Sequence, residues 1–206
     1  EVLSQTKLFL KICPCPIIGV TGTKGKGTTA SLIEKIIEIS GQKAWLAGNI
    51  GKDPFEFIEN ISAKDLVVLE LSSFQIEDLN SSPHIAVVLN ITPDHLNYHK
   101  TFKDYQAAKL SILKYQTAKD FAVLHSNLPE DFKSSGSGKK LTFDANYVLN
   151  WPRKLLGIHN LENISAAVEV GKILNVSESA IKKAVANFEP LPHRLNIIRK
   201  LDGITY

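Results

Sequence analysis

A glycine-rich loop near the start of the chain holds the residues with the clearest capacity for chemistry. The segment GVTGTKGKGTTA, residues 19–30, places Lys26 among glycines. Glycines let backbone N–H groups approach an anion, and lysine adds a mobile positive charge, so the loop suits a phosphate. The pattern G-x-x-x-x-G-K-[ST] is not met, because Gly27 follows Lys26 and the hydroxyls come later, at Thr28 and Thr29. The alternative is a solvent-facing glycine turn, which does not explain the interleaved lysines and following threonines.

Carboxylate, imidazole and amine side chains further along the chain are candidate partners of this loop. Glu70 ends an apolar run, where it could bind a metal ion or pair with a lysine. His95 and His99 have the four-residue spacing of some zinc sites, but no glutamate follows His95 and no third ligand is at hand. Lys109 lies in YQAAKLSIL, which looks like an amphipathic helix, so a solvated lysine is the alternative there.

The elements that must position these side chains are alternating strands and helices. Apolar runs predict strands at residues 17–21, 44–47, 66–71, 85–89 and 121–124. Helical patterns cover residues 26–40, 54–61, 102–115, 159–174 and 177–188, and residues 134–140 are predicted to be a flexible hairpin or loop tip. Buried strands that alternate with helices predict an α/β fold, a three-layer sandwich with a mostly parallel sheet. The glycine loop then lies between a strand and a helix N-terminus, where phosphates bind.

Composition limits the class of protein. With 206 residues, 44% apolar and 22% charged, the chain is predicted to be a globular protein with one large core. A net charge of +3 does not indicate a nucleic-acid-binding face, and no apolar run is long enough to span a membrane. Cys13 and Cys15 lack the spacing of a metal site and are too close for an ordinary disulfide, so we expect incidental thiols in a reducing compartment.

Several longer patterns resemble the Mur ligases, a family that joins a carboxylate to an amino acid through an amide bond. The glycine loop resembles the ATP loop that this family shares with folylpolyglutamate synthases. The run LELSSFQ, residues 69–75, resembles the members that add D-glutamate. Further matches follow in the family's order: AGNIG at 47–51, LNITPDHLNYH at 89–99, GIHNLENISAA at 157–167 and LPHRLNII at 191–198. The resemblance covers nearly the whole chain, but only the central ATPase domain of the family.

The resemblance implies a division of the chain into a linker from an N-terminal domain (1–16), a central ATP-binding domain (17–190), and a hinge with the first strands of a C-terminal domain (191–206). The chain contains no methionine and stops within an apparent strand, so we expect a piece of a longer protein. In the family the outer domains hold the uridine nucleotide and D-glutamate, and a D-S-K-x-T segment is expected shortly after Tyr206. The implied partners are UDP-N-acetylmuramoyl-L-alanine and D-glutamate; the expected state is a monomer without nucleic acid or membrane.

The resemblance also implies a role for each candidate residue. ATP and two Mg²⁺ ions are the implied cofactors. Lys109 is expected to be carbamylated, because an ammonium group has no lone pair for a metal whereas a carbamate is an anion. The implied catalytic residues are Lys26, Glu70, His95 and Lys109, and the implied metal contacts are Thr28, Glu70, His95 and Lys109. His99 is expected at the surface.

The nucleotide and substrate contacts follow from the same resemblance. The implied nucleotide contacts are Gly22, Thr23, Lys24, Gly25, Lys26, Gly27, Thr28, Thr29, Asn160, Asn163 and Arg194. The implied contacts to the muramoyl substrate, or residues that orient the site, are Asn49, Ser72, Gln75 and Tyr105. Two alternatives remain: Asn160 could cap a helix, and Arg194, which with His193 resembles the family's hinge, could be a linker cation.

These features imply an ATP-dependent ligase of peptidoglycan synthesis that activates a carboxylate as an acyl phosphate. Another Mur-type or folylpolyglutamate ligase is one alternative, and the run LSSFQ counts against it. A non-catalytic ATP-binding module is the other. The presence of Glu70, His95 and Lys109 counts against that module, since a protein that only binds nucleotide needs no second metal site.

Overall fold

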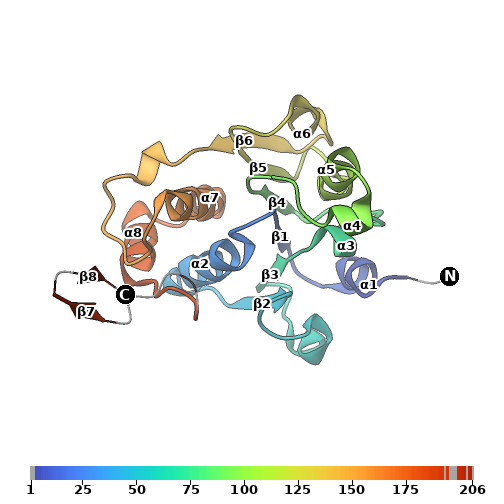
Figure 1. The fold of residues 1–206 in the computed structure, drawn as a ribbon. Coiled ribbons are helices and arrows are strands. Elements are labelled where there is room, and N and C mark those ends of the chain that lie inside the picture. Colours follow the sequence, from blue (N-terminus) through green and yellow to red (C-terminus); the bar gives the residue numbers. More distant parts are fainter. Residues whose placement is uncertain (1–2, 193, 195–198, 203, 206) are drawn as a thin grey trace.

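A parallel sheet forms the centre of the molecule (Figure 1). The computed structural model describes residues 3–192, 194, 199–202 and 204–205. Within this part the sheet contains β1 (Ile17–Thr21), β2 (Ala44–Gly48), β3 (Leu66–Glu70), β4 (Ile85–Val88), β5 (Phe121–His125) and β6 (Lys139–Phe143). Their order is β2-β3-β1-β4-β5-β6, and every neighbouring pair is parallel. The predicted α/β fold is confirmed.

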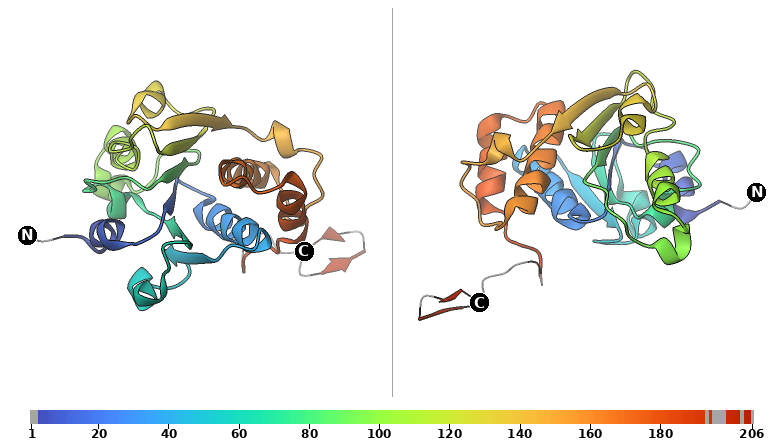
Figure 2. Two further views of the ribbon diagram at one scale, coloured as in Figure 1. Left: turned by 180° about the vertical axis from the view of Figure 1, so that it is seen from behind. Right: turned by 45° about the horizontal axis from the view of Figure 1, so that its top comes forward.

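Helices cover both faces of the sheet and make the three layers (Figures 1 and 2). One face packs against α2 (Lys26–Ile39), α7 (Ile158–Ile173) and α8 (Glu178–Asn187). The other packs against α1 (Gln5–Ile12), α3 (Ser73–Ile76), α5 (Phe102–Leu110) and α6 (Glu130–Ser134). Successive side chains of a strand point to opposite faces, so Ile17 joins one apolar core and Ile18 the other. Both faces are therefore buried, which explains the continuous apolar runs.

The sheet brings four loops to one edge. The central strand β1 lies between β3 and β4, and the chain leaves it at Thr21, passes through the glycine loop and enters α2. Because parallel strands end at the same edge, the segments that follow β2, β3 and β4 meet this loop. A one-turn helix, α4 (Leu96–His99), lies in the segment after β4.

Three segments differ from the sequence-based prediction. The predicted helix at 54–61 is two short 3₁₀ turns, η1 (Pro54–Glu56) and η2 (Ile58–Asn60). The predicted helix at 102–115 ends as an α-helix at Leu110 and continues as turns. The loop predicted at 134–140 ends in β6, which pairs with β5 on one side only. Lysines are typical of such an edge strand, so it lacks the apolar run that identified the others.

The two ends of the chain add smaller elements. Residues 1–16, predicted as a linker, include α1, whose Phe9 is fully buried in the core. The strands predicted within 195–206 correspond to β7 (Lys200–Leu201) and β8 (Ile204–Thr205), an antiparallel pair outside the main sheet. His193 and residues 195–198 lie outside the described residues.

Across the part of the chain that the structure describes, no helix has the length and apolar character to traverse a bilayer. The proposed domain boundaries remain predictions.

Candidate active site

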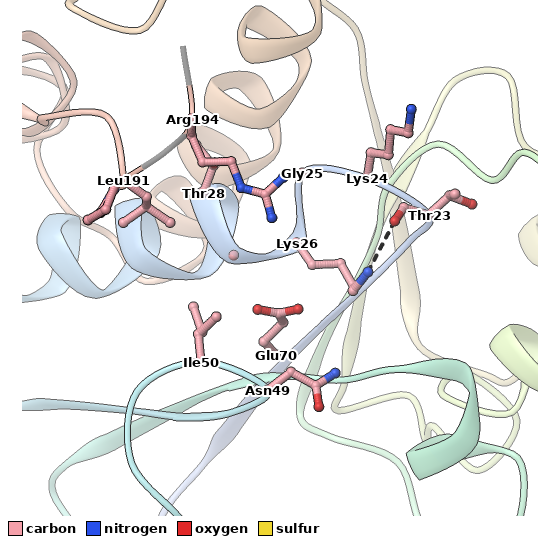
Figure 3. A pocket seen from close by; sticks show the side chains of 12 residues that line it. Thr23, Lys24, Gly25, Lys26, Thr28, Asn49, Ile50, Glu70, Leu191 and Arg194 are labelled. Carbon is pink, nitrogen blue, oxygen red and sulfur yellow. Dashed lines mark hydrogen bonds between the residues drawn. The ribbon is translucent and has the colours of Figure 1, made fainter. Parts of the chain in front are cut away.

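A cavity of about 390 Å³ opens at the edge where the strands end (Figure 3). It is lined by Thr23, Lys24, Gly25, Lys26, Gly27, Thr28, Asn49, Ile50, Glu70, Leu191, Pro192 and Arg194. The side chains of Lys26, Glu70 and Arg194 surround the same space, although they come from α2, β3 and the C-terminal segment. Much of the predicted nucleotide site is therefore brought together.

The glycine loop has a backbone that other residues could not adopt without strain. Gly25 precedes α2 with φ 87°, and a Cβ atom there would lie 2.0 Å from Asn163 Oδ1. At Gly22 a Cβ atom would lie 2.6 Å from the Cβ of Leu89. Since Gly25 has no side chain to cap α2, the first N–H groups of the helix are left to face the cavity. This is the geometry of an anion-binding helix N-terminus.

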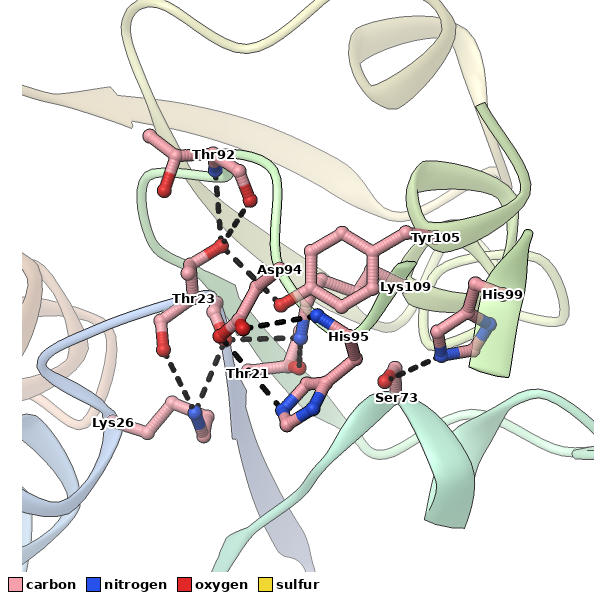
Figure 4. A network of polar contacts seen from close by, with 11 residues as sticks. Thr21, Thr23, Lys26, Ser73, Thr92, Asp94, His95, His99, Tyr105 and Lys109 are labelled. Carbon is pink, nitrogen blue, oxygen red and sulfur yellow. Dashed lines mark hydrogen bonds and ion pairs between the residues drawn. The ribbon is translucent and has the colours of Figure 1, made fainter. Parts of the chain in front are cut away.

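Thr23 ties the loop to the segment after β4 (Figure 4). Its hydroxyl donates to the Thr92 carbonyl (3.1 Å) and accepts from the Thr92 N–H (2.9 Å), while its own N–H donates to the Asn90 carbonyl (3.0 Å). The Thr23 and Tyr105 hydroxyls are 3.3 Å apart. The Thr23 side chain therefore holds the loop in place. Thr92 and Asn90 were not identified from the sequence, because only the fold brings them to the loop.

Two lysine nitrogens meet at one carbonyl oxygen. Lys26 Nζ donates to the carbonyls of Gly22 (3.2 Å) and Thr23 (3.1 Å). Lys109 Nζ donates to the same Gly22 carbonyl (2.9 Å) and to Thr21 Oγ1 (3.3 Å). Lys109 is only 1% exposed, so the alternative of a solvated lysine is wrong. Burial and then the charge of Lys26 lower the pKa of Lys109 from 10.5 to about 7, and the charge of Asp94 opposes this only in part.

Glu70 presents a buried carboxylate to the cavity. Its Oε2 atom has no hydrogen-bond partner, and no ion pair joins Glu70 to a lysine among the described residues. Burial raises the pKa of Glu70, although Lys26 and Arg194 oppose that effect. A Cβ atom at Gly27 would lie 3.2 Å from this Oε2, so a side chain at that position would crowd the carboxylate. An unpartnered carboxylate oxygen beside a hydroxyl such as that of Thr28 suits a hard cation, and the residues present therefore fit Mg²⁺.

His95 lies at the start of α4 on the far side of the loop. Its backbone has φ 51°, and its ring contacts the edge of Phe74 with centroids 5.1 Å apart. Asp94 lies beside it: its Oδ1 accepts from the His95 N–H (2.9 Å) and its Oδ2 is 3.7 Å from His95 Nε2. The Asp94 charge also acts on both lysines, opposing the loss of their protons. Asp94 was missed by the sequence analysis, although its position in the loop after a buried strand could have indicated it.

His99 was expected at the surface, and this expectation is wrong. The residue is 6% exposed, and its Nε2 lies 2.9 Å from Ser73 Oγ on α3. The single turn of α4 carries the His99 ring inward onto α3. The ring packs there against Phe74 and Tyr105.

Asn160 and Asn163 form a second wall, on α7. Asn163 Nδ2 donates to Asn160 Oδ1 (3.0 Å), and Asn160 Nδ2 donates to the Leu156 carbonyl (2.7 Å). The alternative of a helix cap at Asn160 is wrong, because Gly157 occupies that position. Both asparagines line a cavity of about 440 Å³ together with Lys24, Gly25, Thr28, His159 and Arg194. This space shares residues with the first cavity, so it adjoins the phosphate-binding end.

The four predicted substrate contacts are not all in the main cavity. Asn49 lines it. Ser72 and Gln75 instead pair with each other: the Ser72 N–H donates to Gln75 Oε1 (2.9 Å), and the Gln75 N–H donates to Ser72 Oγ (3.4 Å). This capping box begins α3. Tyr105 is 1% exposed and packs behind the loop, beneath Lys109 Nζ, which lies 4.7 Å from its ring centroid. These three residues therefore support the site's walls in this structure.

A parallel α/β sheet with a glycine–lysine loop before a helix defines the chain as a phosphate-loop type of domain. Residues 20–146 match the Mur ligase middle domain, and the chain belongs to this family. It is 34% identical to the UDP-N-acetylmuramoylalanine–D-glutamate ligase of Acetivibrio thermocellus, over 100% of this chain and 50% of that protein. It is 36% identical to the enzyme of the same name from Symbiobacterium thermophilum, over 100% of this chain and 51% of that protein. The chain thus spans about half the length of these relatives.

Solved structures show the same fold at lower identity. The MurF ligase of Thermotoga maritima in complex with ADP superimposes with a TM-score of 0.76 at 19% identity, covering 99% of this chain and 57% of that one. FolC of E. coli in complex with DHPP and ADP gives a TM-score of 0.71 at 18% identity, covering 96% and 64%. At these identities the likeness establishes the fold alone.

Proposed function

We propose that this chain is the ATP-binding and phosphoryl-transfer domain of a cytoplasmic ligase that joins D-glutamate to UDP-N-acetylmuramoyl-L-alanine. The observation that carries the proposal is the meeting of Lys26 and Lys109 at one carbonyl, in a site whose cavity also holds the unpartnered carboxylate of Glu70. A domain that only bound nucleotide would have no use for a buried lysine of lowered pKa behind the phosphate loop. The relatives named UDP-N-acetylmuramoylalanine–D-glutamate ligase match over the whole chain and support this substrate pair.

The proposed reaction has two steps. The carboxylate of the muramoyl-alanine substrate attacks the γ-phosphorus of ATP, the bond to the bridging oxygen breaks, and an acyl phosphate and ADP form. The amine of D-glutamate then attacks the acyl carbon, phosphate leaves, and the amine loses a proton. In the first step Lys26 exchanges its carbonyl partners for phosphate oxygens and stabilises their growing charge, with Arg194 acting from the opposite wall.

Thr28, Glu70 and His95 are the proposed Mg²⁺ contacts, with Lys109 as a fourth once it is carbamylated. When bound, Mg²⁺ neutralises charge on the transferring phosphate. Glu70 is the strongest candidate ligand of the group, because its buried Oε2 atom has no hydrogen-bond partner among the described residues. The absence of a side chain at Gly27 avoids crowding of that atom.

The environment of Lys109 supports its proposed carbamylation. The reaction requires a neutral amine, whose nitrogen attacks CO₂ and then loses a proton to give an anionic carbamate. A pKa of about 7 makes the neutral amine abundant at physiological pH, and the carbamate replaces a cation–cation contact with Lys26 by an attraction. We expect ¹³C-bicarbonate to give a carbamate NMR signal in the wild type that Lys109→Met loses.

Calorimetric titration with ATP and Mg²⁺ tests the nucleotide site. Lys26→Met should weaken binding by about 10- to 100-fold, the effect of losing a charged hydrogen bond. Lys35→Met is the matched control, because Lys35 lies on the same helix in an exposed pair with Glu38. Equal affinity in wild type and Lys26→Met would remove the phosphate-binding role.

The substrates are tested separately, by ADP release and mass spectrometry on the gene product that contains this chain. We expect amide formation with D-glutamate, and none with L-glutamate or a diamino acid. Ligation of another amino acid would replace the D-glutamate assignment while leaving the ligase class. We further propose that the 206-residue chain alone binds ATP weakly and does not ligate, since substrates held elsewhere would not be oriented at this site.

A further inference from the structure

A second polar cluster lies behind the phosphate site, on α3 and α4, and the proposed mechanism does not use it. Its centre is the buried His99, whose Nε2 lies 2.9 Å from Ser73 Oγ (Figure 4). On its other side, His99 Nδ1 lies 4.0 Å from the carboxylate of Glu77. The same carboxylate accepts a hydrogen bond of 2.7 Å from the Tyr98 hydroxyl. Two side chains of α4 are therefore tied to Ser73 on α3 and to Glu77, the residue that follows α3.

The order hydroxyl, imidazole and carboxylate is that of a hydrolase triad, but the geometry excludes nucleophilic catalysis. Ser73 is 1% exposed, and neither it nor His99 lines any of the cavities described above. A substrate therefore could not reach the hydroxyl. Buried and hydrogen-bonded polar groups of this kind fix the relative positions of the elements that carry them.

The element that His99 holds also carries His95. The helix α4 is one turn long, and the residues on either side of it, His95 and Lys100, have φ angles of 51° and 62°. Left-handed backbone at residues other than glycine is strained and persists only where surrounding contacts enforce it. His99 supplies such contacts from the last residue of the turn, while its own N–H donates to the His95 carbonyl (3.1 Å).

An aromatic contact completes the link from His99 to His95. The His99 ring stacks on Phe74, with centroids 5.4 Å apart and planes inclined by 16°. Phe74 also contacts the His95 ring in an edge-type arrangement, with centroids 5.1 Å apart. His99 also touches Tyr105, the residue that packs against Lys109 and Thr23. The imidazole thus supports both sides of the phosphate site from behind.

We propose that His99 is a positioning residue that, through Ser73 and Phe74, holds α4 in the strained turn that presents His95 to the metal–phosphate site. This inference rests on the proposed function for the role of His95, whereas the link between His99 and the geometry of α4 stands on the contacts alone. His99→Phe keeps an aromatic ring but removes both nitrogens. His99→Gln restores an amide group that can donate to or accept from Ser73 Oγ, without the ring.

The first measurement uses the chain without ligand and reports on α4 directly. In ¹H–¹⁵N spectra, His99→Phe should shift or broaden the imidazole signal of His95. The same variant should speed hydrogen exchange at the backbone amides of residues 98 and 99. His99→Gln should recover part of the wild-type spectrum. His84→Phe is the matched control, because His84 also has one acidic partner (Asp120, 3.0 Å) but lies away from α4. An unchanged His95 signal in His99→Phe would overturn the proposal.

The second measurement follows metal binding by the ATP-loaded chain, with Mn²⁺ as the probe. His99→Phe should weaken Mn²⁺ binding about tenfold, the usual effect of losing a group that orients a ligand, while metal-free ATP affinity changes little. Adding His95→Ala should cause no further loss, since both changes remove the same contact. Independent, additive losses would overturn the positioning role. If the wild-type chain bound no ATP, the proposed function would be wrong. The ligand-free spectra would still test the role of His99.

Discussion

Two neighbouring regions of the molecule, the active-site loop and the α3–α4 cluster behind it, are built in opposite ways. On the loop side, the glycine loop and its neighbours contain groups that are strained, unpartnered or unfavourably charged: Gly25 at φ 87°, the Glu70 Oε2 atom and the buried Lys109 amine. In the α3–α4 cluster, polar side chains are paired with one another, as in the contacts of His99 with Ser73 and of Tyr98 with Glu77, the residue that follows α3. The loop side would gain from a charged ligand, whereas the α3–α4 cluster already has its polar partners.

This difference separates binding groups from supporting groups. A buried charge without a partner lowers the stability of the folded chain, so it persists where a ligand compensates it. A paired buried group stabilises the element that carries it. We therefore expect removal of loop-side charges to raise the stability of the ligand-free chain. Removal of the paired polar groups of the α3–α4 cluster should lower it.

Lys109→Met should show the largest effect. The folded pKa of about 7 lies below the unfolded value of 10.5, so between these values the unfolded chain binds more protons. The stability of the wild type therefore rises with pH across this window, and the full penalty is present below pH 7. One pKa unit corresponds to about 1.4 kcal/mol, so the difference between 10.5 and about 7 should make Lys109→Met more stable than the wild type at pH 6 by up to about 5 kcal/mol. Denaturant unfolding in CO₂-free buffer from pH 6 to 9.5 measures this.

The control for this profile is Lys103→Met, at an exposed position on the same helix. It should leave the pH dependence unchanged. If the free energy of unfolding of the wild type did not change between pH 7 and 9.5, Lys109 would have an ordinary pKa. The loop side would then carry no unfavourable charge at this position.

Gly25→Ala should lower stability by about 2–3 kcal/mol and abolish measurable ATP binding. The substitution combines left-handed backbone strain with a contact of 2.0 Å to Asn163 Oδ1. Gly41→Ala separates the two causes, since Gly41 has φ 86° and nothing within 4 Å of its added Cβ. That control should lose about 1 kcal/mol and keep ATP binding. Equal losses in thermal unfolding would mean that Asn163 yields easily and that the close approach is unimportant.

Ser73→Ala should lower stability by about 1–3 kcal/mol, because it leaves a buried imidazole nitrogen without its partner. Ser81→Ala is the comparison. The buried Ser81 Oγ has no hydrogen-bond partner in the part of the chain that the structure describes, so its removal should change the free energy of unfolding little. If Ser73→Ala were as stable as the wild type, the paired groups of the α3–α4 cluster would not stabilise the chain, and the contrast with the loop side would be wrong.

Glu70→Gln should have the smallest effect on stability, a gain of about 1 kcal/mol, together with loss of Mg²⁺-dependent ATP binding. Burial raises the pKa of Glu70 above 4.5, so wild-type stability falls as pH rises through the raised value, and the amide removes that slope. Glu59→Gln, at an exposed position, is the control. A variant that is less stable but still binds ATP with Mg²⁺ would indicate that Glu70 is a structural residue.

The sequence alone determined the five apolar strands, the helix after the glycine loop and the parallel α/β fold, because these depend on local periodicity and on glycine and lysine chemistry. The resemblance of its motifs to the Mur ligases also pointed to Lys26, Glu70, Asn160 and Asn163, and the structure places these residues around two cavities that share lining residues. The edge strand β6 escaped prediction because its lysines show no apolar pattern. The loop anchors Thr92 and Asn90 escaped because they act through contacts with Thr23.

Only the tertiary structure decided which polar side chains are buried. Lys109 and Gly22 are 87 residues apart, and His99 and Ser73 are 26 residues apart. Local sequence patterns therefore could not predict either contact. A lysine on an apparently amphipathic helix and a histidine after a proline-containing loop both look solvent-exposed until packing surrounds them. Burial depends on every neighbouring element at once, and it is burial that lowers the pKa of Lys109 and makes His99 a support for the site.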